Sequence, residues 1–210
     1  MTSPTFPTFP TSPASRERLV ELLRERSFER KRVILASGRE SDFFIDCKQA
    51  VLTAEGHALV GALMFEALDG LPPCEAVAGV ELGGCPLASA VSLVSFLRGR
   101  PLPALYVRKE VKDHGSRKLV EGDRALRPGL RVVILEDVIT TGGSTLKAIE
   151  KLRAVGAEVV GVVALVDRLE GGVEALQASA RAGGHAGGPS ASGLPVVAIC
   201  SRRDFLPDSE

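Results

Sequence analysis

Aromatic residues, excess charge and long apolar runs are all scarce in this sequence. It has no tryptophan, one tyrosine and eight phenylalanines, so few rings are available to stack single-stranded bases. Its 26 basic and 26 acidic residues give a formal charge of zero, whereas proteins that bind nucleic acid by neutralising phosphates usually have a basic excess. No apolar run approaches the roughly 18 residues of a membrane-spanning helix, and the N-terminus has no signal-peptide pattern. We therefore expect a cytoplasmic protein with no nucleic-acid and no membrane partner.

Cysteine is also sparse. The four cysteines are Cys47, Cys74, Cys85 and Cys200, and none forms a C-x-x-C pair. Neither a zinc site nor a disulfide framework is indicated by this spacing. An apolar content of 45% is sufficient for a core, and the length of the chain favours one domain.

Two segments have compositions that favour irregular structure. Residues 1–15 are rich in proline and threonine, which disfavours a helix, so we expect a disordered tail before a single domain at 16–210. Residues 183–193 are mostly glycine, alanine and serine, which predicts a flexible loop within that domain. The proline spacing of the tail is also compatible with a docking ligand for an SH3-like partner.

From residue 76 onward, short runs rich in β-branched residues alternate with helical patterns. Strands are expected at 76–80, 102–107, 131–136, 159–166 and 196–200, and helices near 86–97, 144–155 and 173–182. The run VVIL at 132–135 is apolar at every position, as in strands that are covered on both faces. The pattern predicts an α/β fold with a Rossmann-like parallel sheet flanked by helices. Residues 33–46 predict a small separate β element near two N-terminal helices.

The most specific segment is RVVILEDVITTGGS at 131–144. It contains an apolar strand, two carboxylates, a turn of small residues and the start of a helix, and ligands of open α/β sheets bind at this end of the strands. Backbone N–H groups and hydroxyls from Thr140 to Ser144 can surround a phosphate. Glu136 and Asp137 would repel it unless they accept hydrogen bonds from sugar hydroxyls or face a metal-bound group. The segment therefore indicates a ribose 5-phosphate site, although the turn alone fits a plain strand-to-helix junction equally well.

No P-loop pattern and no G-x-G-x-x-G pattern occurs in the chain, which disfavours the two common nucleotide sites. The string LEDVITTGGS instead resembles the phosphoribosyl pyrophosphate (PRPP) motif of type I phosphoribosyltransferases, above all that of the orotate phosphoribosyltransferases. The resemblance covers about residues 16–205 and implies the type I phosphoribosyltransferase fold with a small N-terminal hood. It implies PRPP contacts from Glu136, Asp137, Val138, Ile139, Thr140, Thr141, Gly142, Gly143 and Ser144.

The hydrophilic segment RKEVKDHG at 108–115 is similar to the catalytic loop of the same family. Taken alone it would be a solvated loop, but pyrophosphate demands concentrated positive charge. The resemblance implies that Arg108, Lys109, Lys112 and His114 contact PRPP in the neighbouring subunit of a homodimer. It implies Lys112, His114 and Asp137 as the catalytic residues.

Two further segments resemble family motifs that lie around the base and the pyrophosphate. The hood motif corresponds to 37–48 and implies that Phe43 and Phe44 lie near orotate, although strand alternation turns successive side chains to opposite faces and favours a core position for one ring. The segment GVELGGCPLA at 79–88 resembles the pyrophosphate loop, with Gly83 and Gly84 at its centre.

Arg168 lies at a predicted strand end, and two positions, Ala36 and Gly83, differ from the family pattern. Arg168 follows a predicted strand, and the resemblance implies that its planar guanidinium grips the orotate carboxylate beside Thr140. Many relatives have lysine where this chain has Ala36, and some where it has Gly83. Lys48 is a possible substitute for the first of these lysines.

The resemblance implies transfer of the phosphoribosyl group of PRPP to orotate, which gives orotidine 5'-monophosphate and pyrophosphate in UMP synthesis. Mg²⁺ would enter on PRPP, with no metal ion held directly by the protein. Three alternatives remain open: a phosphoribosyltransferase for another base, a PRPP-sensing regulator, and a scaffold that docks partners through its tail.

Overall fold

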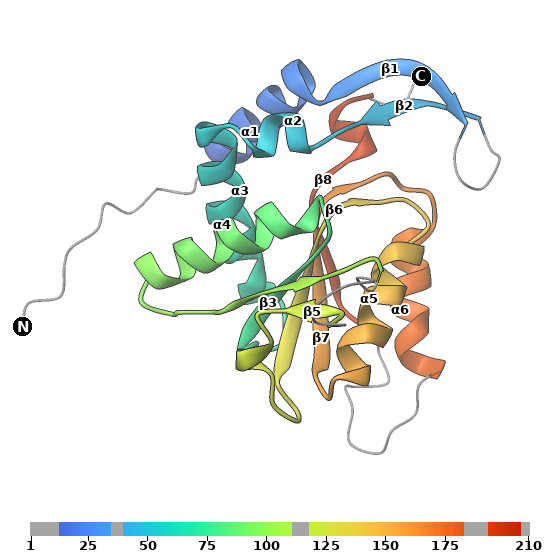
Figure 1. Cartoon of the computed structure of the whole chain (residues 1–210). Helices are drawn as coiled ribbons and strands as arrows, with labels where there is room; N and C mark the ends of the chain where they lie inside the picture. The colour runs from blue at the N-terminus through green and yellow to red at the C-terminus, as the bar shows by residue number, and fades with distance from the viewer. Residues whose placement is uncertain (1–12, 35–39, 111–117, 183–192, 207–210) are drawn as a thin grey trace, which may run out of the picture.

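A six-stranded sheet forms the centre of the molecule, in the order β5-β4-β3-β6-β7-β8 (Figure 1). The computed structural model describes residues 13–34, 40–110, 118–182 and 193–206. The strands are β3 (Ala76–Val80), β4 (Ala104–Val107), β5 (Val120–Glu121), β6 (Arg131–Ile139), β7 (Glu158–Asp167) and β8 (Val196–Ser201). All neighbours are parallel except β4 and β5, which are antiparallel. The predicted parallel sheet is confirmed, and the short edge strand β5 was not predicted.

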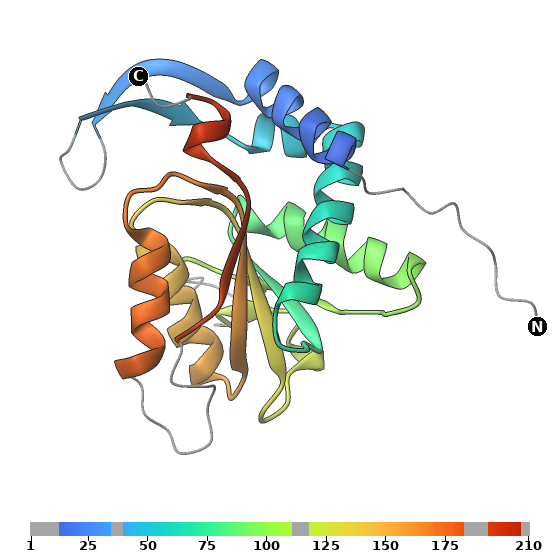
Figure 2. The ribbon, with the colours of Figure 1, turned by 180° about the vertical axis from the view of Figure 1, so that it is seen from behind.

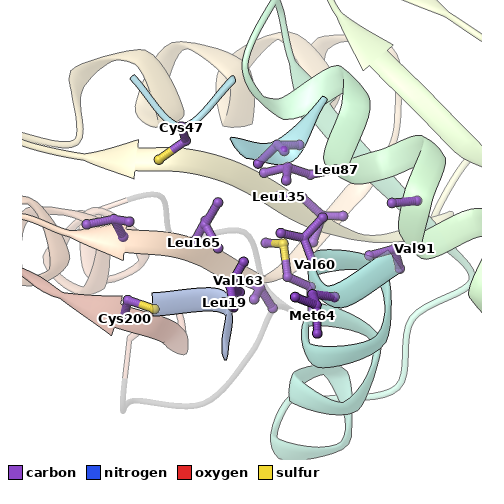
Figure 3. Packing of buried hydrophobic residues seen from close by; sticks show 14 of the residues in the cluster. Leu19, Cys47, Val60, Met64, Leu87, Val91, Leu135, Val163, Leu165 and Cys200 are labelled. Carbon is purple, nitrogen blue, oxygen red and sulfur yellow. The ribbon is translucent and has the colours of Figure 1, made fainter. Parts of the chain in front are cut away.

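Helices cover both faces of this sheet (Figures 1 and 2). They include α3 (Ala54–Ala67) and α4 (Gly84–Leu97) on one face, and α5 (Gly143–Ala154) and α6 (Gly172–Ala182) on the other. Alternation along β6 divides its side chains between two cores, because successive strand residues point to opposite faces. Val133 and Leu135 pack with α3 and α4, whereas Val132 and Ile134 pack with α5 and α6. Figure 3 shows Val60, Met64 and Leu87 of the first core around Leu135.

A separate antiparallel pair, β1 (Phe28–Ile34) and β2 (Glu40–Ile45), lies over one end of the central sheet with α1 (Pro13–Arg26) and α2 (Lys48–Val51) (Figure 1). This is the predicted N-terminal hood. It is joined to the chain's last described turn, η3 (Arg202–Asp204), through an Arg202–Asp42 ion pair of 2.6 Å. The rings of Phe28, Phe43 and Phe205 pack together beneath β1 and β2.

Several element boundaries differ from the sequence-based expectation. α1 begins at Pro13, inside the tail expected to end at 15, because proline lacks only an N–H that the first helical turn leaves unpaired. β6 continues three residues further than expected, since Val138 and Ile139 still pair with β7. Residues 1–12 and 183–192, which hold the rest of the predicted tail and nearly all of the predicted loop, lie outside the described residues. None of the described helices is long and apolar enough to cross a bilayer.

Candidate active site

A cavity of about 420 Å³ lies at the carboxyl ends of β3 and β6, the edge at which open α/β sheets bind ligands. Four parts of the chain converge there: α2 of the hood, the turn after β3, the segment after β4, and the junction of β6 with α5. The lining residues are Lys48, Val80, Glu81, Leu82, Gly83, Lys109, Glu136, Asp137, Val138 and Ser144. The structure thus gathers the predicted carboxylates, the pyrophosphate-loop residue Gly83 and Lys109 around one space.

The turn between β6 and α5 presents the N-terminal end of α5 at this edge. Gly142 caps the helix with a φ of 79°, and a Cβ at this position would lie 2.9 Å from the Gly172 carbonyl oxygen. A side chain is therefore excluded by both conformation and space. Thr141, Gly143 and Ser144 are exposed, and the first N–H groups of a helix have no partner within it. The turn can therefore receive an anion, as the sequence predicts.

Glu136 and Asp137 are adjacent in β6 but meet different surroundings, because they point to opposite faces of the strand. Glu136 is only 4% exposed and accepts a hydrogen bond of 2.8 Å from the Thr145 hydroxyl. Burial, and then the nearby Asp137 carboxylate, raise the pKa of Glu136 to about 8. Both carboxylates were expected to accept hydrogen bonds from sugar hydroxyls. In the structure Asp137 is the more accessible of the two, and Glu136 is held against α5.

Asp137 packs directly on the turn after β3. A Cβ at Gly83 would lie 1.8 Å from its Oδ2 atom, so a larger residue at 83 would displace the carboxylate. Lys48 lines the same cavity from the hood and forms a 2.5 Å ion pair with Asp46. The hydrogen bond that Lys48 donates to Asp46 raises the pKa of Lys48. Lys48 therefore brings a positive charge to the site, as expected of a substitute for the absent lysine at Ala36, which itself lies outside the described residues.

The structure describes only the first three residues, 108–110, of the predicted catalytic loop at 108–115. Lys109 lines the cavity, whereas the Arg108 guanidinium forms a 3.1 Å ion pair with Glu121 of β5. Lys112 and His114 lie within 111–117, outside the described residues. Their predicted contacts with PRPP therefore stay predictions.

Arg168 directly follows β7 and is buried beneath the hood. Its Nη2 donates hydrogen bonds of 3.0 Å to the Ser41 hydroxyl and to the Phe43 carbonyl, and pairs with Glu170 at 2.9 Å. Burial lowers the pKa of Arg168, and Glu170 opposes this effect. The backbone N–H of Arg168 donates to the Ile139 carbonyl, which ties this residue to the turn that carries Thr140.

The two phenylalanines of the hood motif do not share one environment. Phe43 is fully buried, with its ring 5.3 Å from the Arg168 guanidinium carbon, so its ring is not open to a ligand in this arrangement, and its predicted contact with orotate stays a prediction. Its ring instead belongs to the core because β2 turns it inward. Phe44 faces the other way, is partly exposed, and lies 3.9 Å from Lys31 Nζ.

Comparisons with known proteins agree with the geometry of this site. Residues 59–178 match the phosphoribosyl transferase domain family. The chain is 79% identical over 196 residues to the orotate phosphoribosyltransferase of Sorangium cellulosum (strain So ce56), which covers 93% of this chain and 95% of that protein. This chain belongs to the orotate phosphoribosyltransferase family. A second family member, from Bradyrhizobium sp. (strain ORS 278), is 44% identical over 92% of this chain and 98% of its own.

Solved structures of orotate phosphoribosyltransferases share the fold. The enzyme of Mycobacterium tuberculosis H37Rv in complex with Fe(III) dicitrate has a TM-score of 0.73 at 36% identity, over 91% of this chain and 99% of that one. The same enzyme in complex with PRPP has a TM-score of 0.69 at 34% identity, over 91% and 98%. The type I phosphoribosyltransferase fold predicted from the motifs is confirmed.

The side chains around the cavity can be tested against the Mg²⁺ ion that is expected to accompany PRPP. Among the residues that the structure describes, no three His, Cys, Asp or Glu side chains converge as a metal-binding group. The residues that line the cavity include three carboxylates, Glu81, Glu136 and Asp137, of which Glu136 is buried. Mg²⁺ takes oxygen ligands and commonly keeps only one or two from protein carboxylates when phosphates supply others, so this donor set fits such an ion.

The sequence-based expectations did not include three residues that contact and position the site residues of this orotate phosphoribosyltransferase. Thr145 bonds Glu136, Glu170 pairs with Arg168, and Cys47 of the hood donates a 3.8 Å sulfur hydrogen bond to the Asp137 carbonyl. Burial raises the pKa of Cys47 well above its usual value, so it remains a thiol. Thr145 directly follows the phosphate motif and Glu170 lies two residues after Arg168, so the sequence carried a signal for both. The contact of Cys47 with Asp137 joins residues 90 positions apart and arises from folding of the hood.

Proposed function

We propose that this protein is an orotate phosphoribosyltransferase, which transfers the phosphoribosyl group of PRPP to orotate and forms orotidine 5'-monophosphate and pyrophosphate in UMP synthesis. One observation carries the proposal. The N-terminal end of α5, the carboxylate of Asp137 and the cations Lys48 and Lys109 border one space of about 420 Å³. PRPP contains the complementary groups, namely a 5'-phosphate, ribose hydroxyls and a diphosphate. Family membership and the relative in complex with PRPP support the same assignment.

In this reaction a nitrogen of orotate forms a bond to C1' of the ribose while the bond from C1' to the diphosphate oxygen breaks. The bonding electron pair leaves with pyrophosphate. Val138 to Ser144 bind the ribose phosphate, with Ile139 and the two turn glycines acting through their backbone, and Asp137 accepts a hydrogen bond from a ribose hydroxyl. Glu136 supports this end of β6 through Thr145. Catalysis then depends on positioning and on stabilising the charge that departs.

The positive charges act on the diphosphate. We assign this role to Arg108, Lys109, Lys112 and His114, with backbone N–H groups at Gly83 and Gly84. A hydrogen bond to a charged group contributes about 1.5–3 kcal/mol, and about 1.4 kcal/mol corresponds to a factor of ten in rate. Two or three such bonds, formed only in the transition state, therefore supply several powers of ten.

Orotate is bound between the hood and the phosphate turn, which is the turn between β6 and α5. Arg168 recognises its carboxylate, and Thr140 and the backbone of the hood at Phe43 and Phe44 border the base. Phe43 supports the Arg168 guanidinium from below. A planar guanidinium can form two parallel hydrogen bonds with a carboxylate, which distinguishes orotate from uracil.

Three finer assignments complete the proposal. Mg²⁺ would be carried by PRPP, with the carboxylates of Glu81 and Asp137 available to it, and would supply positive charge at the diphosphate. The protein acts as a homodimer in which the segment that contains Lys112 and His114 serves the neighbouring subunit. The enzyme works in the cytoplasm.

The decisive experiment is formation of orotidine 5'-monophosphate from orotate, PRPP and Mg²⁺, with uracil, adenine and hypoxanthine as competing acceptors. We expect product from orotate alone. Preferred transfer to another base would assign the same fold to a different phosphoribosyltransferase, and PRPP binding without any transfer would favour a sensing protein.

A further inference from the structure

The side chain of Lys151 connects helix α5 to the start of the hydrophilic segment at 108–115, which we call the cationic segment. Its Nζ donates hydrogen bonds of 2.7 Å to the backbone carbonyl oxygens of both Arg108 and Lys109. Lys151 lies near the end of α5, and the two carbonyls lie just beyond β4. One ammonium group therefore holds two consecutive peptide units of a segment more than 40 residues away in sequence.

Arg108 is also held from the other side, by β5 and the residue that precedes this strand. The N–H of Arg108 donates to the Leu119 carbonyl at 2.9 Å, and its guanidinium pairs with Glu121. Both of these contacts involve Arg108, and neither involves Lys109. The carbonyl of Lys109 accepts its bond from Lys151, so Lys151 defines the direction of the chain at Lys109.

Lys109 is the residue for which that direction matters. Lys109 lines the 420 Å³ cavity together with Asp137, and it also lines a second cavity of about 340 Å³ with Lys147 and Lys151. The direction of the chain at Lys109 therefore decides which of the two cavities its side chain can enter.

Electrostatics alone would not place Lys151 here. Arg108, Lys109 and Lys147 line the same 340 Å³ cavity as Lys151, together with the carboxylate of Glu110, so Lys151 meets three like charges against one opposite charge. The two carbonyl oxygens compensate, because an ammonium has three donors and each charged hydrogen bond is stronger than a neutral one. The position of Lys151 therefore depends on the contact with the backbone of the cationic segment.

We propose that Lys151 is a positioning residue for phosphoribosyl transfer: it holds the backbone at Arg108 and Lys109 so that the Lys109 side chain faces the diphosphate of PRPP. The proposal rests on the proposed function, because it assigns Lys109 to that diphosphate. It adds a requirement that the backbone at Arg108 and Lys109 stays attached to α5 during turnover.

The test compares Lys151→Met, which keeps the length of the side chain and removes its donors, with Lys151→Arg, which restores donors. Since misplacement of a catalytic group by about 1 Å can cost 10²-fold, we expect Lys151→Met to lower kcat/KM for PRPP about tenfold or more. The KM for orotate should stay within about twofold, because uniform binding of the base is untouched. Lys151→Arg should recover most of the loss.

Lys147→Met is the matched control, since Lys147 lies one turn earlier on α5, is exposed and lines the same 340 Å³ cavity. It should leave kcat/KM for PRPP nearly unchanged. Amide hydrogen exchange gives a readout that is independent of activity: peptides spanning 106–110 should exchange faster in Lys151→Met than in the wild type or in Lys147→Met.

Two results would overturn the inference: wild-type kcat/KM for PRPP in Lys151→Met, or an equal loss in Lys147→Met. Failure of the proposed function looks different, because the wild-type protein would then form no orotidine 5'-monophosphate. The exchange experiment would still report whether Lys151 holds the segment.

Discussion

The hydroxyl of Thr145 donates a hydrogen bond of 2.8 Å to the carboxyl group of Glu136, and both side chains are buried. Thr145→Val keeps the shape of the side chain and removes this donor. The hydrogen bond lowers the pKa of Glu136 against the larger effect of burial, so its loss leaves a buried carboxyl group with one partner fewer. We expect Thr145→Val to lower the free energy of unfolding by about 1–3 kcal/mol, measured by urea denaturation. Thr145→Ser keeps the hydroxyl and should lose much less; equal losses would show that the methyl group, not the bond, is responsible.

The raised pKa of Glu136 makes a prediction about pH. A carboxyl group with a pKa of about 8 in the folded protein and an ordinary pKa of about 4.3 in the unfolded chain keeps its proton only when folded, between these two values. The folded state then binds more protons than the unfolded state, so its stability falls as pH rises from about 4.5 to about 8.

Glu136→Gln removes this titration. The stability of the variant relative to the wild type should therefore increase between pH 5.5 and pH 8.5, by an amount on the order of 1–3 kcal/mol. Urea denaturation of both proteins at the two pH values measures it. A stability difference that is independent of pH would mean that the Glu136 carboxyl group titrates alike in the folded and unfolded states.

Gly83 leaves space for the carboxylate of Asp137. A Cβ there would lie 1.8 Å from Asp137 Oδ2, so Gly83→Ala must turn the carboxylate away from its present position. Because the displaced Asp137 carboxylate would lose its contact with the ribose, we expect kcat/KM for PRPP to fall about tenfold or more. The melting temperature should change little. Gly70→Ala is the control, since a Cβ at Gly70 meets no atom within 4 Å. Full activity of Gly83→Ala would remove Asp137 from the proposed site.

Arg168 and Arg202 both place a guanidinium group over the ring of Phe43, at 5.3 and 5.5 Å. Only Arg168 is assigned to the orotate carboxylate. Arg168→Lys keeps the charge but loses the planar fork, so we expect the KM for orotate to rise about tenfold or more and the KM for PRPP to change little. Steady-state kinetics with each substrate varied separately checks this. Arg202→Lys should leave both constants close to wild type, and a comparable rise in that variant would place orotate elsewhere.

The proposed exchange of catalytic segments between subunits can be tested by mixing two inactive proteins. Lys112→Ala should reduce kcat far more than it weakens PRPP binding, and Asp137→Asn should disable the other half of a site. When the two variants exchange subunits, some mixed dimers contain one site with both residues intact, and activity should return towards one quarter of the wild-type value, if dimers form at random and each holds one intact site. Absence of recovery after proven subunit exchange would mean that Lys112 serves its own subunit.

The amino-acid sequence by itself determined the parallel sheet, the phosphate turn and the family. The run VVIL at 132–135 is apolar at every position, so both faces of this strand must be covered. The turn after the strand needs a positive φ, which glycine at 142 can adopt. These features are local, because each follows from the periodicity or the backbone freedom of a few consecutive residues. The resemblance of the motif to orotate phosphoribosyltransferases added the substrates in the same way, from a contiguous string.

Only the tertiary structure decided which of two neighbouring side chains is available to a ligand. Glu136 and Asp137, and likewise Phe43 and Phe44, are equivalent in the motif but lie on opposite faces of a strand, and the neighbouring elements bury one of each pair. The same holds for Lys151, whose partners are two carbonyl groups more than 40 residues distant. A backbone carbonyl has no sequence signature, so its partner becomes visible only when the chain has folded and the remaining donors and acceptors are accounted for.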